Sequence, residues 1–129
     1  MEDSPQSHND KLMKTGYEIL KQCKELSYPC FIWGGGAIYH MLNGKLDYRK
    51  MSDVEFMLPK SVDSGVESIL ENIGFIPYST FNNMQNMYAM PRREYYLPDR
   101  ELTEAEIGDV KHGQKGDVKD VNFQKVELF

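Results

Sequence analysis

The chain has 129 residues, of which 40% are hydrophobic and 27% are charged, and this balance indicates a single globular domain rather than a disordered chain. Its net charge of −5 argues against a broad electrostatic grip on nucleic acid. The sequence has neither an apolar run long enough to cross a membrane nor a secretory signal, so we expect a cytoplasmic protein that does not act in a membrane.

The amino-terminal part divides into two segments of different character. Residues 1–9 are polar and contain Pro5, which predicts a mobile leader. From Asp10 onward apolar residues recur at helical spacing, which predicts a helix that ends before Pro29. We therefore expect one domain over residues 10–129.

A glycine turn follows the first helix. Residues 30–33 are apolar, aromatic and β-branched, which predicts a short buried strand, and residues 37–42 have the pattern of a helix. Gly34, Gly35 and Gly36 lie between them, where missing side chains let a phosphate group approach the backbone at a helix start. The alternative is a tight turn that lets the helix pack closely on the strand.

A second strand is predicted over residues 53–58, where apolar residues alternate with Asp53 and Glu55. Carboxylates two residues apart on a strand project from the same face. Two like charges this close destabilise each other unless a cation lies between them, and Mg²⁺ or Mn²⁺ prefers such oxygen ligands. The alternative is a solvated strand face.

The remaining elements are short. The pattern predicts a helix that ends at Gly74, a helical turn at Thr103 with Glu106 as a capping box, and several strands. These strands are expected near residues 75–76, 87–90, 94–97 and within 118–129. Together they favour an α/β (α+β) fold with a mixed, largely antiparallel sheet flanked by helices.

Two motifs resemble one known family. Trp-Gly-Gly-Gly over residues 33–36 and Asp-Val-Glu-Phe over residues 53–56 are similar to the signature of the DNA polymerase β-like nucleotidyltransferase superfamily. Arg49 and Ser52, which precede the first carboxylate, resemble its minimal, abortive-infection-type branch. The resemblance covers residues 29–75.

The resemblance implies an enzyme that moves a nucleoside monophosphate from a nucleoside triphosphate, with ATP expected, to an acceptor hydroxyl and releases pyrophosphate. It implies that Asp53 and Glu55 hold Mg²⁺ or Mn²⁺ together with a third carboxylate. Glu127 is the best match for this third acid, with Asp120 and Glu94 as alternatives. It also implies that the nucleotide is contacted by the glycine turn and by two further residues, namely Gly34, Gly35, Gly36, Arg49 and Ser52.

The acceptor and the partner are not specified by the resemblance. A small molecule, a protein or tRNA can be the acceptor, and residues 75–98, a second copy in a homodimer or a partner protein can recognise it. Glu in the second and third acidic positions, with a long spacing before Asp53, leaves a second hypothesis open: a catalytically degenerate nucleotide-binding module, such as the antitoxin of a toxin–antitoxin pair or a regulatory partner. A third is an unrelated α/β interaction domain.

Overall fold

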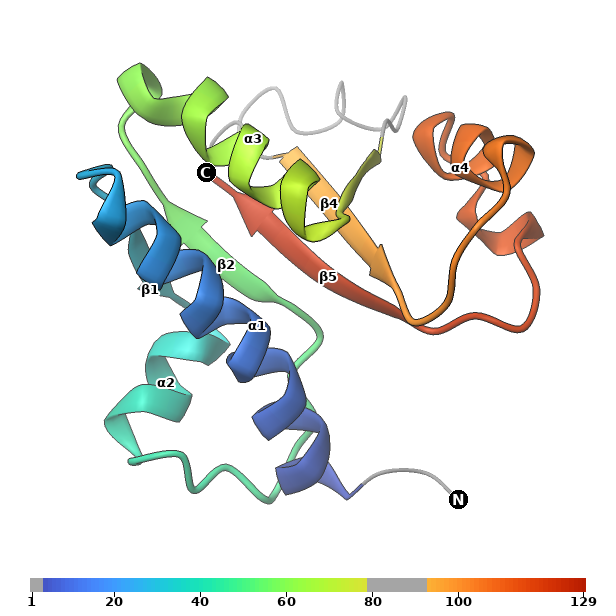
Figure 1. The fold of residues 1–129 in the computed structure, drawn as a ribbon. Helices are drawn as coiled ribbons and strands as arrows, with labels where there is room; N and C mark the ends of the chain where they lie inside the picture. Colours follow the sequence, from blue (N-terminus) through green and yellow to red (C-terminus); the bar gives the residue numbers. More distant parts are fainter. Residues whose placement is uncertain (1–3, 79–92) are drawn as a thin grey trace, which may run out of the picture.

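The protein is built around a five-stranded sheet with the order β1-β2-β5-β4-β3 (Figure 1). The computed structural model describes residues 4–78 and 93–129. β2 and β5 are parallel, and the other neighbouring strands are antiparallel, so the predicted mixed, largely antiparallel sheet is confirmed. The strands are β1 (Phe31–Trp33), β2 (Val54–Met57), β3 (Ile76–Tyr78), β4 (Arg93–Pro98) and β5 (Phe123–Leu128).

Four α-helices flank this sheet in the described part of the chain, as predicted. α1 and α3 pack against each other over one face, whereas α2 follows β1 and α4 packs beside β3 (Figure 1). The helices are α1 (Pro5–Glu25), α2 (Gly35–Met41), α3 (Asp63–Ile73) and α4 (Glu104–Lys111), with short 3-10 helices η1 (Lys60–Val62) and η3 (Lys115–Asp117).

The main core lies between the two central strands and helices α1 and α3. Val54 and Phe56 of β2 and Val126 and Leu128 of β5 are fully buried in one cluster with apolar residues of both helices. Because side chains alternate along a strand, the residues between them point to the opposite face. This alternation places Glu55 and Glu127 on the sheet face that α1 and α3 leave open.

The predicted mobile leader is wrong from Pro5 onward. Helix α1 begins at Pro5, and the side chain of Ser4 caps it by accepting a hydrogen bond from the Ser7 backbone. Asn9 lies on the buried side of this early part of the helix and is 0% exposed. The apolar spacing is absent there because a hydrogen-bonded polar residue takes the buried position.

The first strand is not the buried strand that its apolar sequence predicts. In the described sheet β1 pairs with β2 and forms an edge, and Phe31 is 65% exposed. An apolar run alone does not report how many neighbours a strand has. The predicted end of α3 and start of α4 agree with the structure. Gly74 adopts the left-handed conformation after α3, and Thr103 and Glu106 form the capping box of α4.

Two further predictions concern a strand over residues 87–90 and the absence of a membrane-spanning helix. The strand expected over residues 87–90 lies outside the described residues. Among the helices that the structure describes, none combines the length and apolar character needed to cross a bilayer.

Candidate metal centre

Three carboxylates converge on the open face of the sheet. Asp53 directly precedes β2, Glu55 lies on β2, and Glu127 lies beside Glu55 in the parallel register of β2 and β5. Each offers one oxygen atom, and these atoms all lie within 4.8 Å of one another. Asp53 is 8% exposed and Glu127 is 3% exposed, so two of the acids are buried. Oxygen ligands at such spacing fit a divalent cation.

Lys125 lies within this group of acids. Its Nζ atom is 2.7 Å from Oε1 of Glu127 and 3.6 Å from Oδ2 of Asp53. It is also 3.6 Å from Oε1 of Glu94, which stands opposite Glu127 in the register of β4 and β5. The centre therefore already has one internal cation, and three carboxylates share it.

The electrostatics of the centre act most strongly on Asp53. Burial, followed by the neighbouring Glu127 and Glu55, raises the pKa of Asp53 to about 7. Burial lowers the pKa of Lys125, but its hydrogen bond to Glu127 and the negative charges around it raise that pKa overall. Lys125 thus stays charged, while Asp53 takes up a proton near neutral pH because burial and the two neighbouring carboxylates disfavour its charged form.

This proton predicts an unusual pH dependence of stability in the absence of metal. Between about pH 4 and pH 7 the folded protein holds a proton on Asp53 that the unfolded chain releases, so the free energy of unfolding falls as the pH rises through this window. We expect a loss on the order of 2 kcal/mol, shared among coupled acids. Urea unfolding in EDTA at pH 5 and pH 8 measures it, and a free energy that rises with pH and is unaffected by Asp53→Asn contradicts it.

The glycine turn touches the acidic group. Gly34 has a positive φ of 66°, and a Cβ atom there would lie 3.0 Å from Oε2 of Glu55. A Cβ atom on Gly35 would lie 3.9 Å from Nη2 of Arg49, whereas one on Gly36 would lie 2.7 Å from a methyl group of Ile32. Gly34 therefore borders the acids, Gly35 lies beside Met51 and Arg49, and Gly36 serves the close packing of helix on strand that was the alternative interpretation.

Gly34→Ala is expected to disturb both the fold and the acids. An alanine at positive φ is strained, and its methyl group would push the Glu55 carboxylate, so we expect a loss of about 2 kcal/mol in stability. Thermal unfolding and Mn²⁺ titration measure the two effects. Gly108→Ala is the matched control, since a methyl group there meets nothing within 4 Å and should stabilise α4 by about 0.5 to 1 kcal/mol. If Gly34→Ala and Gly108→Ala change the stability and the Mn²⁺ affinity equally, the prediction is contradicted.

The connector of residues 45–52, which leads to Asp53, is hydrogen-bonded to the second turn of α1. Nδ2 of Asn9 donates to the carbonyl groups of Leu46 and Arg49, at 2.9 and 2.8 Å, and Oδ1 accepts from the Met51 backbone at 2.7 Å. Nε2 of His8 lies 2.7 Å from the carbonyl oxygen of Met51. A helix thus sets the path of the connector that leads to Asp53.

The structure brings together most of the residues singled out in the sequence. Arg49 lies beside Gly35, and the exposed Ser52 directly precedes Asp53. Glu94 joins the acids through Lys125, whereas Asp120 lies in the loop before β5, where its carbonyl group accepts a hydrogen bond from Arg100. The nucleotide-binding roles of these residues stay predictions.

Two residues of the centre were missed in the sequence. Lys125 stands two residues before Glu127, so strand alternation alone places both on one face and was a usable signal. Asn9 gave no local signal, because its partners lie about forty residues along the chain.

Comparisons of the chain with protein-family models, curated proteins and solved structures found no match.

Proposed function

We propose that the protein is a metal-dependent nucleotidyltransferase that moves a nucleoside monophosphate from a nucleoside triphosphate to an acceptor hydroxyl. The observation that carries the proposal is the convergence of Asp53, Glu55 and Glu127 from two adjacent strands within 4.8 Å. The resemblance of the glycine and Asp-x-Glu motifs to the nucleotidyltransferase superfamily supplies the reaction class. The contact of Gly34 with Glu55 supports it, since it joins the two motifs in space.

The carboxylates are suited to Mg²⁺ or Mn²⁺, because both ions take oxygen ligands and keep water molecules that phosphate oxygens can replace. Asp53 and Glu55 would hold the cation at the triphosphate, and Glu127 would complete the set. A bound divalent cation would neutralise the charge that develops on the phosphate and lower the pKa of the attacking hydroxyl. Gly34 lies beside Glu55, and Gly35 and Arg49 lie beside each other. In this proposal these residues and Ser52, which adjoins Asp53, would contact the triphosphate.

The reaction is a displacement at the α-phosphorus. The acceptor oxygen forms a bond to phosphorus while the bond to the bridging oxygen breaks, and pyrophosphate leaves with that electron pair. The proton of the hydroxyl passes to Glu127 or to solvent. Positioning and neutralisation of charge by the residues of the centre supply most of the rate, as in other phosphoryl transfers.

The test is direct. The full chain is incubated with Mn²⁺ and each α-³²P-labelled nucleoside triphosphate, with small-molecule, tRNA and protein acceptors including the chain itself. Transfer of label with release of pyrophosphate is the expected result. Trp33 is the one tryptophan of the chain and stands beside Glu55 in the sheet register, so its fluorescence reports binding separately. Absence of any Mn²⁺-dependent binding of a nucleoside triphosphate overturns the proposal.

A second candidate is a nucleotide-binding module without catalysis, such as an antitoxin or a regulatory partner. The observation that favours it is Lys125, whose amino group lies among the carboxylates that would hold the cation. In this candidate the lysine takes over the neutralising role of the metal. Nucleotide binding without transfer of label to any acceptor would support it.

Lys125→Gln distinguishes the two candidates. If the acids form a metal site, removing the competing internal cation should tighten Mn²⁺ binding by about tenfold and make the metal-free protein less stable. Isothermal titration and thermal unfolding with and without Mn²⁺ measure this, with the exposed Lys119→Gln as control. A destabilised variant that Mn²⁺ does not rescue indicates that the lysine is the intended cation.

A further inference from the structure

An apolar patch lies beside the acids on the same face of the sheet. Residues that stand opposite each other in antiparallel strands share a face, and Trp33 of β1 stands opposite Glu55 of β2. Phe31 and Met57 form the other opposite pair on this face. Phe129 directly follows β5, and its ring centroid lies 5.0 Å from that of Trp33. Four residues, Phe31, Trp33, Met57 and Phe129, thus form an aromatic patch.

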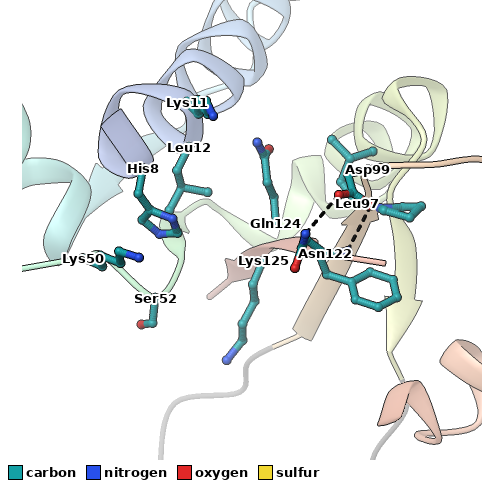
Figure 2. Close-up of a pocket in the computed structure, with 12 residues that line it drawn as sticks. His8, Lys11, Leu12, Lys50, Ser52, Leu97, Asp99, Asn122, Gln124 and Lys125 are labelled. Atoms are coloured by element: carbon teal, nitrogen blue, oxygen red, sulfur yellow. Dashed lines mark hydrogen bonds between the residues drawn. The ribbon is translucent and has the colours of Figure 1, made fainter. Parts of the chain in front are cut away.

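The aromatic patch and the acids lie on the face of the sheet that turns away from α1. Figure 2, a close-up of the cavity beside α1, shows the two faces at β5, where Gln124 points toward α1 and Lys125 points away from it. The side chain of Gln124 accepts a hydrogen bond from Thr15 of α1 at 2.7 Å. Lys125 instead contacts Glu127 at 2.7 Å and Asp53 at 3.6 Å. A ligand that reaches the acids therefore approaches from the face opposite α1.

The aromatic patch belongs to neither hydrophobic core of the described residues. Phe31 is 65% exposed, and the other three side chains are partly buried. A second aromatic group on this face is already packed in the smaller core beside α4, and it consists of Tyr78, Tyr96 and Phe123. Within the described part of the chain, the aromatic patch is thus the aromatic surface next to the acids that is open to a ligand.

The position of the aromatic patch relative to the acids fits a nucleotide. Phe31 and Trp33 come before Gly34 along the chain, and Glu55 stands opposite Trp33. Residues two apart on a strand are separated by roughly 7 Å, and a ribose places a base at a similar distance from its phosphate. With the triphosphate at the glycine turn and its α-phosphate at the acids, the base would reach the aromatic patch.

The chemistry of the aromatic patch indicates which part of a ligand it binds. Its side chains are three aromatic rings and a thioether, and none of them is charged. The adjoining acids and a net charge of −5 disfavour a nucleic-acid strand on this surface. Nε1 of Trp33, the one nitrogen among these side chains, is buried and has no hydrogen-bond partner among the described residues. The aromatic patch therefore offers ring faces for stacking and no exposed donor that would read the edge of a base.

We propose that the aromatic patch is a stacking platform for the base of the nucleoside triphosphate. This inference rests on the proposed nucleotidyl transfer and names its substrate class: purine nucleoside triphosphates are bound more tightly than pyrimidine ones, and adenine and guanine are bound about equally. Aromatic side chains on an open sheet face bind bases through their π faces. Such stacking accepts every base and is strengthened by the larger ring system of a purine.

The test uses the full chain with Mg²⁺ and compares the α,β-methylene analogues of ATP, GTP and CTP with ribose 5′-triphosphate, which has no base. In isothermal titration the ATP and GTP analogues should bind about tenfold more tightly than ribose 5′-triphosphate, with the CTP analogue between them. The fluorescence of Trp33 should fall with the purine analogues and not with the ligand that lacks a base. Equal affinity for the ATP analogue and ribose 5′-triphosphate overturns the inference, and this comparison needs no variant.

The variants locate the base on the aromatic patch. Phe31→Ala should weaken binding of the ATP analogue about tenfold and leave binding of ribose 5′-triphosphate unchanged, whereas Phe31→Tyr, which keeps a ring, should retain both affinities. Met41→Ala is the matched control, because Met41 is 79% exposed on α2 and belongs to neither core. If Phe31→Ala weakens both ligands equally, or neither, the base does not stack on the aromatic patch.

Failure of this inference and failure of the proposed function give different results. Mg²⁺-dependent binding of every triphosphate with the same affinity overturns the stacking platform alone. Absence of Mg²⁺-dependent binding of any triphosphate overturns the proposed function and the platform with it. Self-association of the free chain in analytical ultracentrifugation, abolished by Phe31→Ala and not by Met41→Ala, would show that a second copy covers the aromatic patch and would also overturn the platform.

Discussion

Replacing Asp53 by Asn is expected to lower Mn²⁺-dependent transfer of label by about 1,000-fold. Asp53 is the acid that both neighbouring carboxylates act on, and its oxygen lies within 4.8 Å of theirs. The amide has nearly the same shape but no negative charge, so it removes one anionic ligand without changing the packing. Initial rates of pyrophosphate release and the affinity for Mn²⁺ measure the loss.

The same substitution should stabilise the protein when metal is absent. Above pH 7 the charged Asp53 is repelled by Glu55 and Glu127, and the neutral amide removes this repulsion. We therefore expect Asp53→Asn to melt at a higher temperature than the wild type at pH 8 in EDTA, and Mn²⁺ should stabilise only the wild type.

The control for this variant is Asp47→Asn, which removes an exposed carboxylate from the connector that leads to Asp53. It should leave transfer, Mn²⁺ affinity and melting temperature unchanged. Loss of stability in Asp53→Asn together with unchanged activity would show that the acids serve the fold, with Lys125 as their partner.

If the acids bind a divalent ion, three cations would compete for them. Lys125 already contacts the carboxylates that could hold the ion, and the proton on Asp53 near neutral pH would be a third competitor. A metal ion must displace the proton and shift the amino group, so its affinity should rise with pH. This competition explains how one arrangement can be a metal site or a lysine-neutralised charge cluster, and why activity and stability must be measured on the same variants.

The sequence predicted the parts of the site that depend on local pattern. Strand alternation placed Asp53 and Glu55 on one face, and the glycines marked the turn beside them. The pairing of Glu127 with Glu55 depends on the register of two strands about seventy residues apart, which the sequence alone left to resemblance. The edge position of β1 likewise depends on which strands pair, and an apolar run does not encode it.

Asn9 shows a different limit, because it is a polar residue that takes a core position. Replacing it by Ala is expected to destabilise the protein by about 3 kcal/mol, since it leaves the backbone groups of Leu46, Arg49 and Met51 without their partner. The connector would then loosen, and the affinity for Mn²⁺ should fall with stability. Urea unfolding and Mn²⁺ titration measure the two effects.

Asn9→Asp separates the hydrogen bonds from the packing. The carboxylate keeps an acceptor for the Met51 backbone but loses both bonds that Nδ2 donates, so it should also destabilise, in contrast to Asn72→Ala at an exposed position of α3. If Asn9→Ala and Asn9→Asp both stay within about 0.5 kcal/mol of the wild type, the first turns of α1 do not hold the connector. A fall in Mn²⁺ affinity in both Asn9 variants, with Asn72→Ala unchanged, would place the first turns of α1 within the support of the metal centre.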